Sequence, residues 1–244
     1  MKSKNSVIGI EVYSRLLPQY YGMTIPKTLK KYLDIASFTS LLDCGCGDGA
    51  LLHALKQKNY FKNRVVSAID LSQNRINLVK KIDPEIHTYV DSAETLNSIK
   101  SNSIDFFMTT HVIEHVDDKK MLKAIDRVVK KNGTIYIATI FKKWWGWYYY
   151  RKDGKWVMDL THLREYMNDQ ELLDLIDRKQ FKIIEIQKTQ LSFPIIDFVI
   201  RRLFMNNLIT NREFFAKNIL FNLMRKITLP VPGYYNWEIV LKKN

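Results

Sequence analysis

The chain has 244 residues, of which 46% are apolar and 26% are charged. A chain of this length and composition can bury a core, so intrinsic disorder is excluded and one domain, with or without an added lobe, is expected. The 38 basic and 25 acidic side chains give a formal charge of +13, which favours a negatively charged partner: nucleic acid, anionic lipid or an acidic small molecule.

The N-terminal residues and the cysteines bear on the cell compartment. The N-terminus lacks the long apolar core of a signal peptide, and charges interrupt every apolar run before it reaches the roughly 18 residues of a membrane span. Cys44 and Cys46 are too few and too close together for a disulfide framework or a four-ligand zinc site. We therefore expect a cytoplasmic protein, with contact to a membrane surface as an open alternative.

Short runs rich in Ile, Val and Phe alternate with amphipathic stretches of helix length. This alternation is typical of βα units around a mainly parallel sheet. The predicted strands are Thr39–Cys44, Arg64–Asp70, Ile86–Asp91, Ser103–Thr110, Gly133–Thr139, Phe181–Thr189 and Tyr234–Leu241. The predicted helices are Gly49–Asn59, Ser72–Ile82, Asp117–Lys130 and Asp169–Arg178, with Ser72 and Asn168 as N-caps.

The last crossover breaks this alternation. Residues 191–226 predict one or two further amphipathic helices, and Pro230-Val231-Pro232-Gly233 predicts a turn before the final strand. No internal repeat or low-complexity linker interrupts the chain. We expect a single α/β domain with four parts: an N-terminal helical cap (1–37), a cofactor-binding half (38–140), an aromatic lid (141–167) and a helical insertion (191–229).

The loop between the first predicted strand and helix contains three glycines: Gly45, Gly47 and Gly49. Their missing side chains let the backbone approach a ligand and leave N–H groups pointing at it. With Ala50 the loop also satisfies the dinucleotide pattern G-x-G-x-x-(G/A). However, Asp43 and Asp48 would place two carboxylates against a pyrophosphate, so the loop favours a cationic ligand instead.

Four motifs follow one another along the chain: Asp43-Cys44-Gly45-Cys46-Gly47-Asp48-Gly49, Ala68-Ile69-Asp70-Leu71-Ser72, Asp91-Ser92-Ala93-Glu94 and Ile104-Asp105-Phe106-Phe107. In this order and spacing, from about Thr39 to Thr139, they resemble a class I S-adenosylmethionine-dependent methyltransferase. S-adenosylmethionine has no phosphate and carries an ammonium and a sulfonium. The resemblance implies a doubly wound, Rossmann-like sheet of seven strands, mostly parallel with one antiparallel edge strand.

The resemblance also implies a site, position by position. Asp43 and the glycine loop would hold the methionine portion, Asp70 would bind the ribose hydroxyls, and Asp91 with its two successors would bracket the adenine. The implied cofactor-binding residues are Asp43, Gly45, Cys46, Gly47, Gly49, Asp70, Leu71, Asp91, Ser92, Ala93 and Thr110.

Two further stretches most resemble small-molecule methyltransferases of the quinone-biosynthesis type: Val112-Ile113-Glu114-His115-Val116 and Thr161-His162-Leu163-Arg164-Glu165-Tyr166. Quinone O-methyltransferases usually carry Glu where this chain has His111, so we predict no metal. His111, Glu114 and His115 also match H-x-x-E-H, but a strand runs into this motif where a zinc protease needs a helix. Binding of one metal ion by this trio stays a side hypothesis.

Residues just beyond the fourth strand stand at the carboxyl edge of such a sheet, where the ligand lies. If the acceptor is a hydroxyl, a neutral imidazole there can take its proton. We predict His111 as the first candidate for this base and His162 as the second. The alternative for each is a structural, hydrogen-bonded histidine.

Two later segments bear on the methyl acceptor. Residues 141–152 gather three of the five tryptophans and four basic residues, a composition that fits stacking on a planar acceptor, a sugar or bases, a lipid interface, or a packed lid. Residues 191–226 mix apolar positions with six basic side chains. They suit a membrane surface, a lipid-linked acceptor, a substrate-covering subdomain or a homodimer face.

These observations predict an enzyme that methylates a hydroxyl, less readily an amine, of a small molecule, a glycan or a lipid-linked acceptor. A nucleic-acid methyltransferase is the rival on grounds of charge. Against it, Thr109-Thr110-His111-Val112 lacks the Asn/Asp-Pro-Pro-Tyr element of many base methylases, and no RNA-binding domain is appended. A third alternative is a methyltransferase-like protein that only binds a partner.

Overall fold

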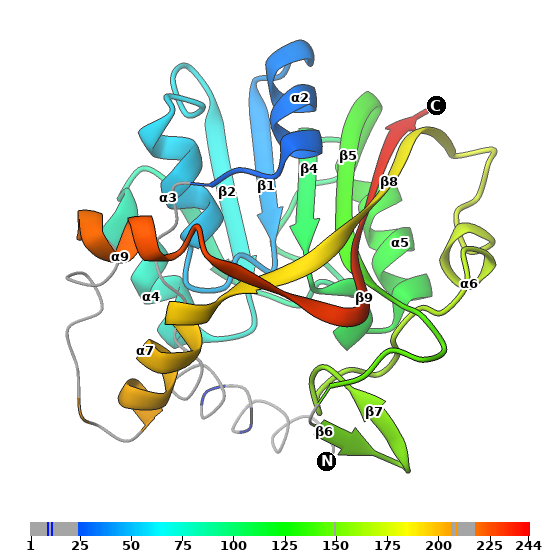
Figure 1. Ribbon diagram of the computed structural model, residues 1–244. Helices are drawn as coiled ribbons and strands as arrows, with labels where there is room; N and C mark the ends of the chain where they lie inside the picture. The colour runs from blue at the N-terminus through cyan, green and yellow to red at the C-terminus, as the bar shows by residue number, and fades with distance from the viewer. Residues whose placement is uncertain (1–8, 10, 12–23, 149, 206–207, 209–217) are drawn as a thin grey trace.

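The computed structural model describes residues 9, 11, 24–148, 150–205, 208 and 218–244. Its main sheet has seven strands in the order β3-β2-β1-β4-β5-β9-β8 (Figure 1). The strands are β1 (Ser40–Cys44), β2 (Val65–Asp70), β3 (His87–Val90), β4 (Ile104–Thr110), β5 (Val129–Lys142), β8 (Phe181–Pro194) and β9 (Thr228–Lys243). The pairs among β3, β2, β1, β4 and β5 are parallel, and β9 is antiparallel to both β5 and β8. The predicted class, a mostly parallel sheet of seven strands, is confirmed, but the reversed strand was predicted at the edge and instead lies second from it, because β8 pairs on its outer side.

The helices in the described residues follow the predicted order. They are α2 (Lys27–Ile35), α3 (Ala50–Gln57), α4 (Gln73–Ile82), η1 (Ile113–His115), α5 (Asp118–Val128), α6 (Gln170–Leu173), α7 (Ile195–Met205) and α9 (Ile219–Met224). Ser72 caps α4 as predicted, because its side chain accepts a hydrogen bond from the Arg75 N–H at 3.2 Å. Asn168 likewise accepts from the Glu171 N–H at 3.1 Å, but the helix that follows is only four residues long.

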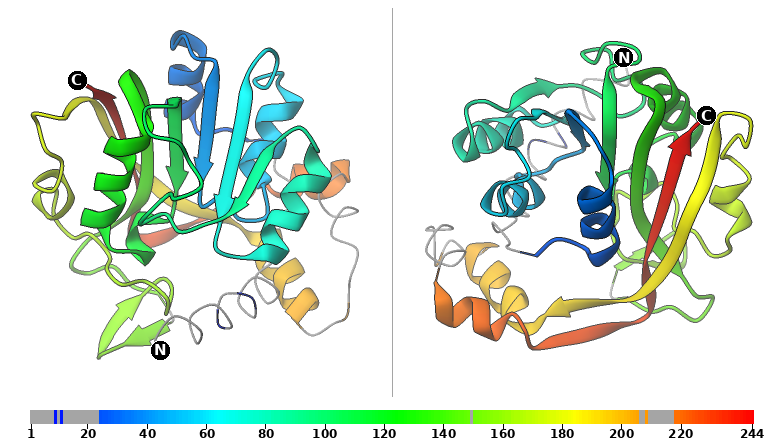
Figure 2. Two further views of the ribbon diagram at one scale, coloured as in Figure 1. Left: turned by 180° about the vertical axis from the view of Figure 1, so that it is seen from behind. Right: turned by 90° about the horizontal axis from the view of Figure 1, so that it is seen from above.

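Helices cover both faces of the sheet (Figure 2), and an apolar layer packs between the helices and the sheet on each face. Successive strand residues point to opposite faces, so Leu41 packs in the layer with α2, α3 and α4, while Leu42 packs in the layer with α5 and α6. Both residues are fully buried. The central strands therefore read as continuous apolar runs, as strands of a parallel sheet covered on both faces do.

Helix α2 is held to strands β5 and β9 by a buried polar contact. Thr28 Oγ1 donates to Glu238 Oε2 of β9 at 2.8 Å, and the Tyr136 hydroxyl of β5 donates to the other oxygen of the same carboxylate. This contact fixes residues 24–37 of the predicted cap, residues 1–37, on one face of the sheet. The rest of that cap, apart from Gly9 and Glu11, lies outside the described residues.

The prediction of a turn at Pro230–Gly233 is wrong. Strand β9 begins at Thr228, and Pro230 pairs with Ser192 of β8. The pairing of β9 with β5 ends at Tyr234, so residues 228–233 have β8 on one side and no β5 neighbour on the other. Proline is tolerated there because the missing N–H faces no partner strand. A register shift near Gln190 and the positive φ of Gly233 (72°) bend this ribbon without ending it.

The two-stranded ribbon continues into helices, as the predicted helical insertion requires. We call residues 191–205 and 218–233 the arm, which consists of the outer ends of β8 and β9 with α7 and α9. Since Tyr234 pairs with Lys142 at the carboxyl end of β5, the arm extends beyond the carboxyl edge of the sheet (Figures 1 and 2). Within the described residues, no helix is both long and apolar enough to cross a membrane.

Candidate active site

The glycine loop joins β1 to α3 at the carboxyl edge of the sheet. The N–H groups of Gly45 and Cys46 donate to the Ile69 carbonyl of β2 at 2.8 and 2.9 Å. Gly45 has a φ of 75°, and a Cβ at this position would lie 2.2 Å from Cγ2 of Val112. Only glycine fits this close approach, so the loop is clamped between β2 and the segment that follows β4.

Asp70 ends β2 and orients the same loop. Its Oδ2 accepts from the Gly47 N–H at 3.0 Å, and its Oδ1 accepts from the Ser72 N–H at 2.9 Å. Arg75 of α4 lies close to two acids, with Nη1 3.7 Å from Asp70 Oδ2 and Nε 3.5 Å from Asp48 Oδ1. Sequence reasoning missed Arg75. Its place one turn after the acidic end of β2 is the signal that could have found it.

Asp43, at the carboxyl edge of the sheet, is a buried acid with a carboxylate oxygen that is unpaired among the described residues. It is 1% exposed, and its Oδ1 makes no hydrogen bond to any described residue. Burial, and then the charge of Asp70, raises the pKa of Asp43 to about 7. An ammonium group at this position would supply both the missing donor and a compensating charge. The residues present therefore fit the amino end of S-adenosylmethionine.

The predicted adenine residues lie beside Asp70. The Asp91 N–H donates to the Asp70 carbonyl at 3.1 Å, which joins the ends of β2 and β3. The carboxylate of Asp91 accepts from the N–H groups of Ser92 and Ser98, both at 2.7 Å. Asp91 thus shapes its own turn, and its role and those of Ser92 and Ala93 in binding the adenine stay predictions. Leu71 and Thr110, at the ends of β2 and β4, border the same edge.

Cys44 and Cys46 are free and buried. Burial, reinforced by the charges of Asp43 and Asp70, raises the pKa of both thiols well above the ordinary value. Thiolates are therefore disfavoured at both positions. The two side chains fill space beside the glycine loop, as the sequence indicates for small residues there.

His111 stands directly after β4 at this edge. Its φ is 55°, its N–H donates to the Ala138 carbonyl at 2.8 Å, and its side chain is 43% exposed. The Nδ1 atom lies 3.3 Å from Oε1 of Glu114, which is fully buried and accepts from Thr139 Oγ1 at 2.9 Å. Burial alone would raise the pKa of Glu114, but the contact with His111 and the charges of His111 and His115 outweigh burial and lower it.

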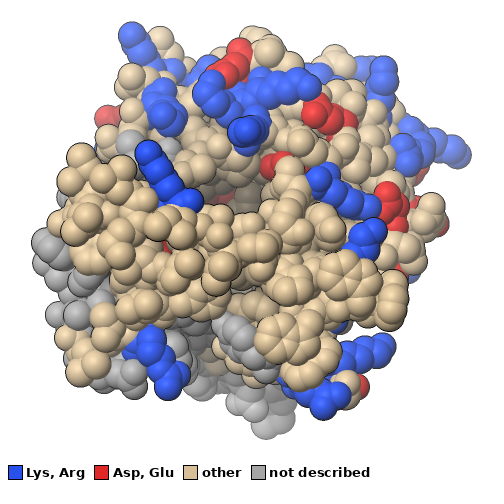
Figure 3. Space-filling model, in the orientation of Figure 1, with Lys and Arg blue, Asp and Glu red and all other residues tan. Residues whose placement is uncertain are grey.

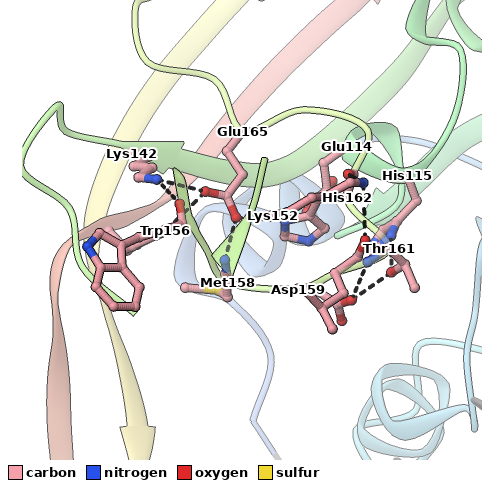
Figure 4. A network of polar contacts seen from close by, with 12 residues as sticks. Glu114, His115, Lys142, Lys152, Trp156, Met158, Asp159, Thr161, His162 and Glu165 are labelled. Carbon is pink, nitrogen blue, oxygen red and sulfur yellow. Dashed lines mark hydrogen bonds and ion pairs between the residues drawn. The ribbon is translucent and has the colours of Figure 1, made fainter. Parts of the chain in front are cut away.

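The Thr161–Tyr166 element packs against η1 (Figure 4). The Leu163 N–H donates to the Glu114 carbonyl at 2.9 Å, and the rings of His115 and His162 meet edge to face with centroids 4.6 Å apart. Thr161 Oγ1 lies 3.0 Å from His115 Nδ1. Burial is the main cause that lowers the pKa of His115, so this imidazole is mostly neutral at pH 7.

Glu165 organises the buried side of this element (Figure 4). Its carboxylate accepts from the Met158 N–H at 2.6 Å and the Tyr234 hydroxyl at 3.0 Å, and it lies 2.9 Å from His162 Nδ1 and 3.4 Å from Lys142 Nζ. Burial would raise the pKa of Glu165, but these contacts lower it. Sequence reasoning missed this role. The i, i+3 spacing of His162 and Glu165 was the available signal.

The two predicted bases differ in access. The side chain of His111 is nearly half exposed, whereas that of His162 is 5% exposed. The structure brings His162 to His115 and Glu114, and Glu114 in turn contacts His111. Of the two predicted bases, His111 is therefore the more accessible and His162 is buried.

One group of described residues has the composition of a metal site. Ligand atoms of Glu114, His115 and His162 all lie within 4.8 Å of one another. This set replaces His111 of the H-x-x-E-H trio with His162. The Nδ1 atoms of both histidines and one oxygen of Glu114 already have protein partners. The absence of a metal stays a prediction.

The aromatic segment lies beside the arm and is largely uncovered. It contains a small hairpin of β6 (Tyr150–Lys152) and β7 (Lys155–Val157). Three tryptophans are exposed, at 83% for Trp144, 50% for Trp145 and 48% for Trp147. Tyr148 of this segment is buried, against Tyr234. A lid packed for stability does not explain such exposure, whereas an interaction surface does.

Comparison with known proteins agrees with this geometry. Residues 42–137 match the family model described as a methyltransferase domain. The chain is 25% identical to the mitochondrial ubiquinone biosynthesis O-methyltransferase of Saccharomyces cerevisiae, over 72% of this chain and 62% of that protein. It is 27% identical to the ubiquinone biosynthesis O-methyltransferase of Bartonella bacilliformis, over 62% of this chain and 64% of that protein. The matches thus span somewhat less than two thirds of these relatives.

A solved structure shares the fold over its whole length. The geranyl diphosphate C-methyltransferase of Streptomyces coelicolor, in complex with Mg2+, geranyl diphosphate and S-adenosyl-L-homocysteine, superposes with a TM-score of 0.62 at 14% identity, covering 98% of this chain and 97% of that chain. Residues 42–137 thus carry a methyltransferase domain, and this match, the strand order and the four motifs together support a class I S-adenosylmethionine-dependent methyltransferase with S-adenosylmethionine as its cofactor.

Proposed function

We propose that this protein transfers a methyl group from S-adenosylmethionine to a hydroxyl oxygen of a small-molecule acceptor. The observation that carries the proposal is the position of His111, an accessible imidazole one residue beyond β4, at the edge that also holds Asp43, Asp70 and the glycine loop. The O-methyltransferase relatives support oxygen over nitrogen as the methylated atom.

The cofactor, when bound, supplies a methyl group on a sulfonium that an in-line nucleophile displaces. The chain's own residues position the reactants and handle the proton. Glu114 faces Nδ1 of His111, which favours the tautomer with the proton on Nδ1 and leaves Nε2 to accept the proton of the acceptor hydroxyl. Asp43 holds the cofactor's ammonium, and Asp70, fixed by two backbone N–H groups, presents its carboxylate to the ribose.

The acceptor we favour carries an apolar group, and a lipid-linked acceptor is the finer form of this proposal. Exposed aromatic side chains and the arm lie beyond the carboxyl edge of the sheet, and the arm extends past the ends of β1 and β2 toward α3 and α4 (Figure 1). A planar ring or an isoprenoid-like chain would find apolar contacts there. A free glycan would stack on the aromatic faces but would make no use of the apolar side chains of the arm.

Calorimetry with S-adenosylmethionine and S-adenosylhomocysteine tests the cofactor half of the proposal. Asp70→Ala should lower the affinity by about 1–3 kcal/mol, because hydrogen bonds to a charged group are lost. Asp174→Ala, an exposed acid beyond α6, is the matched control and should bind normally. If the folded wild-type protein binds neither compound, the proposal that it is a methyltransferase is refuted.

Radiolabelled cofactor tests the acceptor half. Fractions of cell extract are incubated with the enzyme, and the label is followed into small-molecule, lipid, glycan and nucleic-acid pools. We expect label in the lipid or small-molecule pool, in a product whose methyl ether resists mild base. Label confined to nucleic acid would establish the rival function.

A further inference from the structure

We propose that the arm and the exposed tryptophan segment form one docking face for the surface of an anionic lipid bilayer. The purpose of this face rests on the proposed function, but its existence is independent of it. The first observation is the exposure of α9, where Ile219 is 78%, Leu220 59% and Leu223 52% exposed. On α7, Phe198 and Val199 are 38% and 50% exposed. Single exposed apolar residues are ordinary, but a contiguous set marks an interaction surface.

The apolar residues continue along the strands of the arm to the tryptophans. Ile227 and Leu229 are 62% and 54% exposed. The ribbon then meets the aromatic segment, where the Trp147 N–H donates to the Pro232 carbonyl at 3.2 Å and the Lys143 N–H donates to the Gly233 carbonyl at 2.8 Å. Backbone hydrogen bonds therefore fix helices, ribbon and tryptophans as one face. Figure 3 shows it as a broad uncharged band across the lower half of the molecule.

The charges around this band suit an anionic surface. The arm contains four basic side chains and one acidic side chain. The acid, Asp197 of α7, is paired with Arg225 at 2.9 Å, and Lys226 is exposed at the end of α9. In Figure 3 most acidic side chains lie above the band, whereas basic side chains flank it. An apolar strip with a basic border and tryptophans is the composition of interfacial membrane-binding elements.

The same charges argue against a second copy of this chain as the partner that covers the band. The chain has a formal charge of +13, and two copies would bring their basic borders together. An anionic bilayer instead supplies opposite charge around the band and an apolar layer beneath it. Basic side chains near such a surface each contribute about 1 kcal/mol of attraction.

The position of the face gives the docking a use. The arm extends from β9 just where Tyr234 pairs with the carboxyl end of β5, the edge at which His111 stands. Figure 3 shows a hollow directly above the band. A bilayer bound to the band would therefore present a membrane-embedded acceptor beside the proposed base, without the whole acceptor entering water.

Vesicle flotation tests the proposal on the full chain. Vesicles of phosphatidylcholine alone are compared with vesicles that contain about one third phosphatidylglycerol, at about 0.1 M and 1 M salt. We expect the protein to float with the anionic vesicles at low salt, and about tenfold less with neutral vesicles or at high salt. A protein that stays at the bottom with anionic vesicles at low salt would overturn the proposal.

A pair of double variants locates the face. Ile219→Asp with Leu223→Asp places charge on α9, whereas Ile35→Asp with Val65→Asp places the same charge on residues of similar exposure, 67% and 55%, at the amino edge of the sheet. We expect at least a tenfold loss of vesicle binding in the first pair and less than a twofold change in the second. Equal losses would mean that net charge alone drives binding, which contradicts a defined face.

Two further readouts separate the outcomes. Brominated lipids should quench tryptophan fluorescence, because three of the five tryptophans lie on the face and Trp237 is buried elsewhere. A dimer in lipid-free solution that the α9 variant dissociates would show that a second copy covers the band and would overturn the proposal. Calorimetry with S-adenosylhomocysteine checks that each variant is folded. Vesicle binding without cofactor binding would refute the proposed function and leave the docking face standing.

Discussion

The cofactor side of the carboxyl edge, residues 38–140, and the proposed acceptor side, residues 141–244, differ in their charge. On the cofactor side, residues 38–140 carry 14 basic and 12 acidic side chains, and the acids Asp43, Asp48 and Asp70 are buried around the glycine loop. On the proposed acceptor side, residues 141–244 carry 18 basic and 11 acidic side chains, and tryptophans are exposed. Residues 141–244 therefore contribute +7 to the formal charge of +13 and residues 38–140 only +2, so the segment that contains the glycine loop is the one nearest to neutral.

The largest expected effect is the loss of kcat on substitution of His111, which lies at the boundary between the two sides. His111→Ala should lower kcat about 10²- to 10⁴-fold, because the general base is lost, and leave cofactor affinity within about twofold. His162→Ala should slow transfer as well, but also lower Tm, because it leaves the buried carboxylate of Glu165 without one partner. Initial rates, calorimetry and thermal melts separate the two. If neither variant slows transfer, histidine is not the base.

The closed packing of the cofactor side can be tested at the glycine loop. Gly45→Ala should destabilise the fold by about 2–5 kcal/mol, because it adds the strain of a positive φ to a clash with Val112. Gly154→Ala is a matched control, since its φ is 77° but no heavy atom lies within 4 Å of the new Cβ. It should cost about 1–2 kcal/mol. Equal losses in urea unfolding would mean that Val112 moves aside and the loop is not clamped.

The buried acid predicts a pH dependence of known sign. The pKa of Asp43 is raised from 3.8 to about 7 on folding, so the folded state holds the extra proton and stability without cofactor should fall as pH rises from about 4 to 7. A bound cation favours the ionised form, so cofactor affinity should rise over pH 6 to 8 with release of a proton. Calorimetry in buffers of different ionisation enthalpy measures that proton. Asp43→Asn should remove both trends, and an unchanged profile would assign them to another group.

The smallest effect is expected on the exposed side. Trp144→Ala should change the free energy of unfolding by no more than about 0.5 kcal/mol and leave cofactor affinity unchanged, because the side chain is 83% exposed. Trp237→Ala, in the fully buried core, should cost about 3–5 kcal/mol. Similar losses in the two variants would mean that the tryptophan segment belongs to the folded core rather than to an interaction surface.

Local patterns predicted the parts of the fold that are local in origin. Ser72 at the start of α4 and the apolar runs of β1 and β4 were identified because a cap and a buried strand each depend on a few adjacent residues. The turn at Pro230–Gly233 was wrong because proline and glycine mark a turn and a bent, one-sided ribbon in the same way. Only the partner strand decides between the two.

The candidate site likewise contains residues that local patterns predict and contacts that they do not. Asp43, Asp70 and His111 could be predicted because each sits at the end of a strand whose position the sequence indicates. The contacts of Glu165 with Lys142 and Tyr234 could not, because they join residues far apart in the chain on separate elements. The exposure of the tryptophans was likewise open, since their composition suits a packed lid and a bare surface equally.

The place of β9 inside the sheet has a consequence for synthesis. Strand β8 pairs with β9 alone in the described sheet, and β9 follows β8 along the chain. While a ribosome is still making β9, β5 and β8 each present an unpaired edge, and β8 has no place in the sheet. The nascent chain must therefore keep two open edges apart until β9 has emerged, a stage at which chaperone binding has the most to protect.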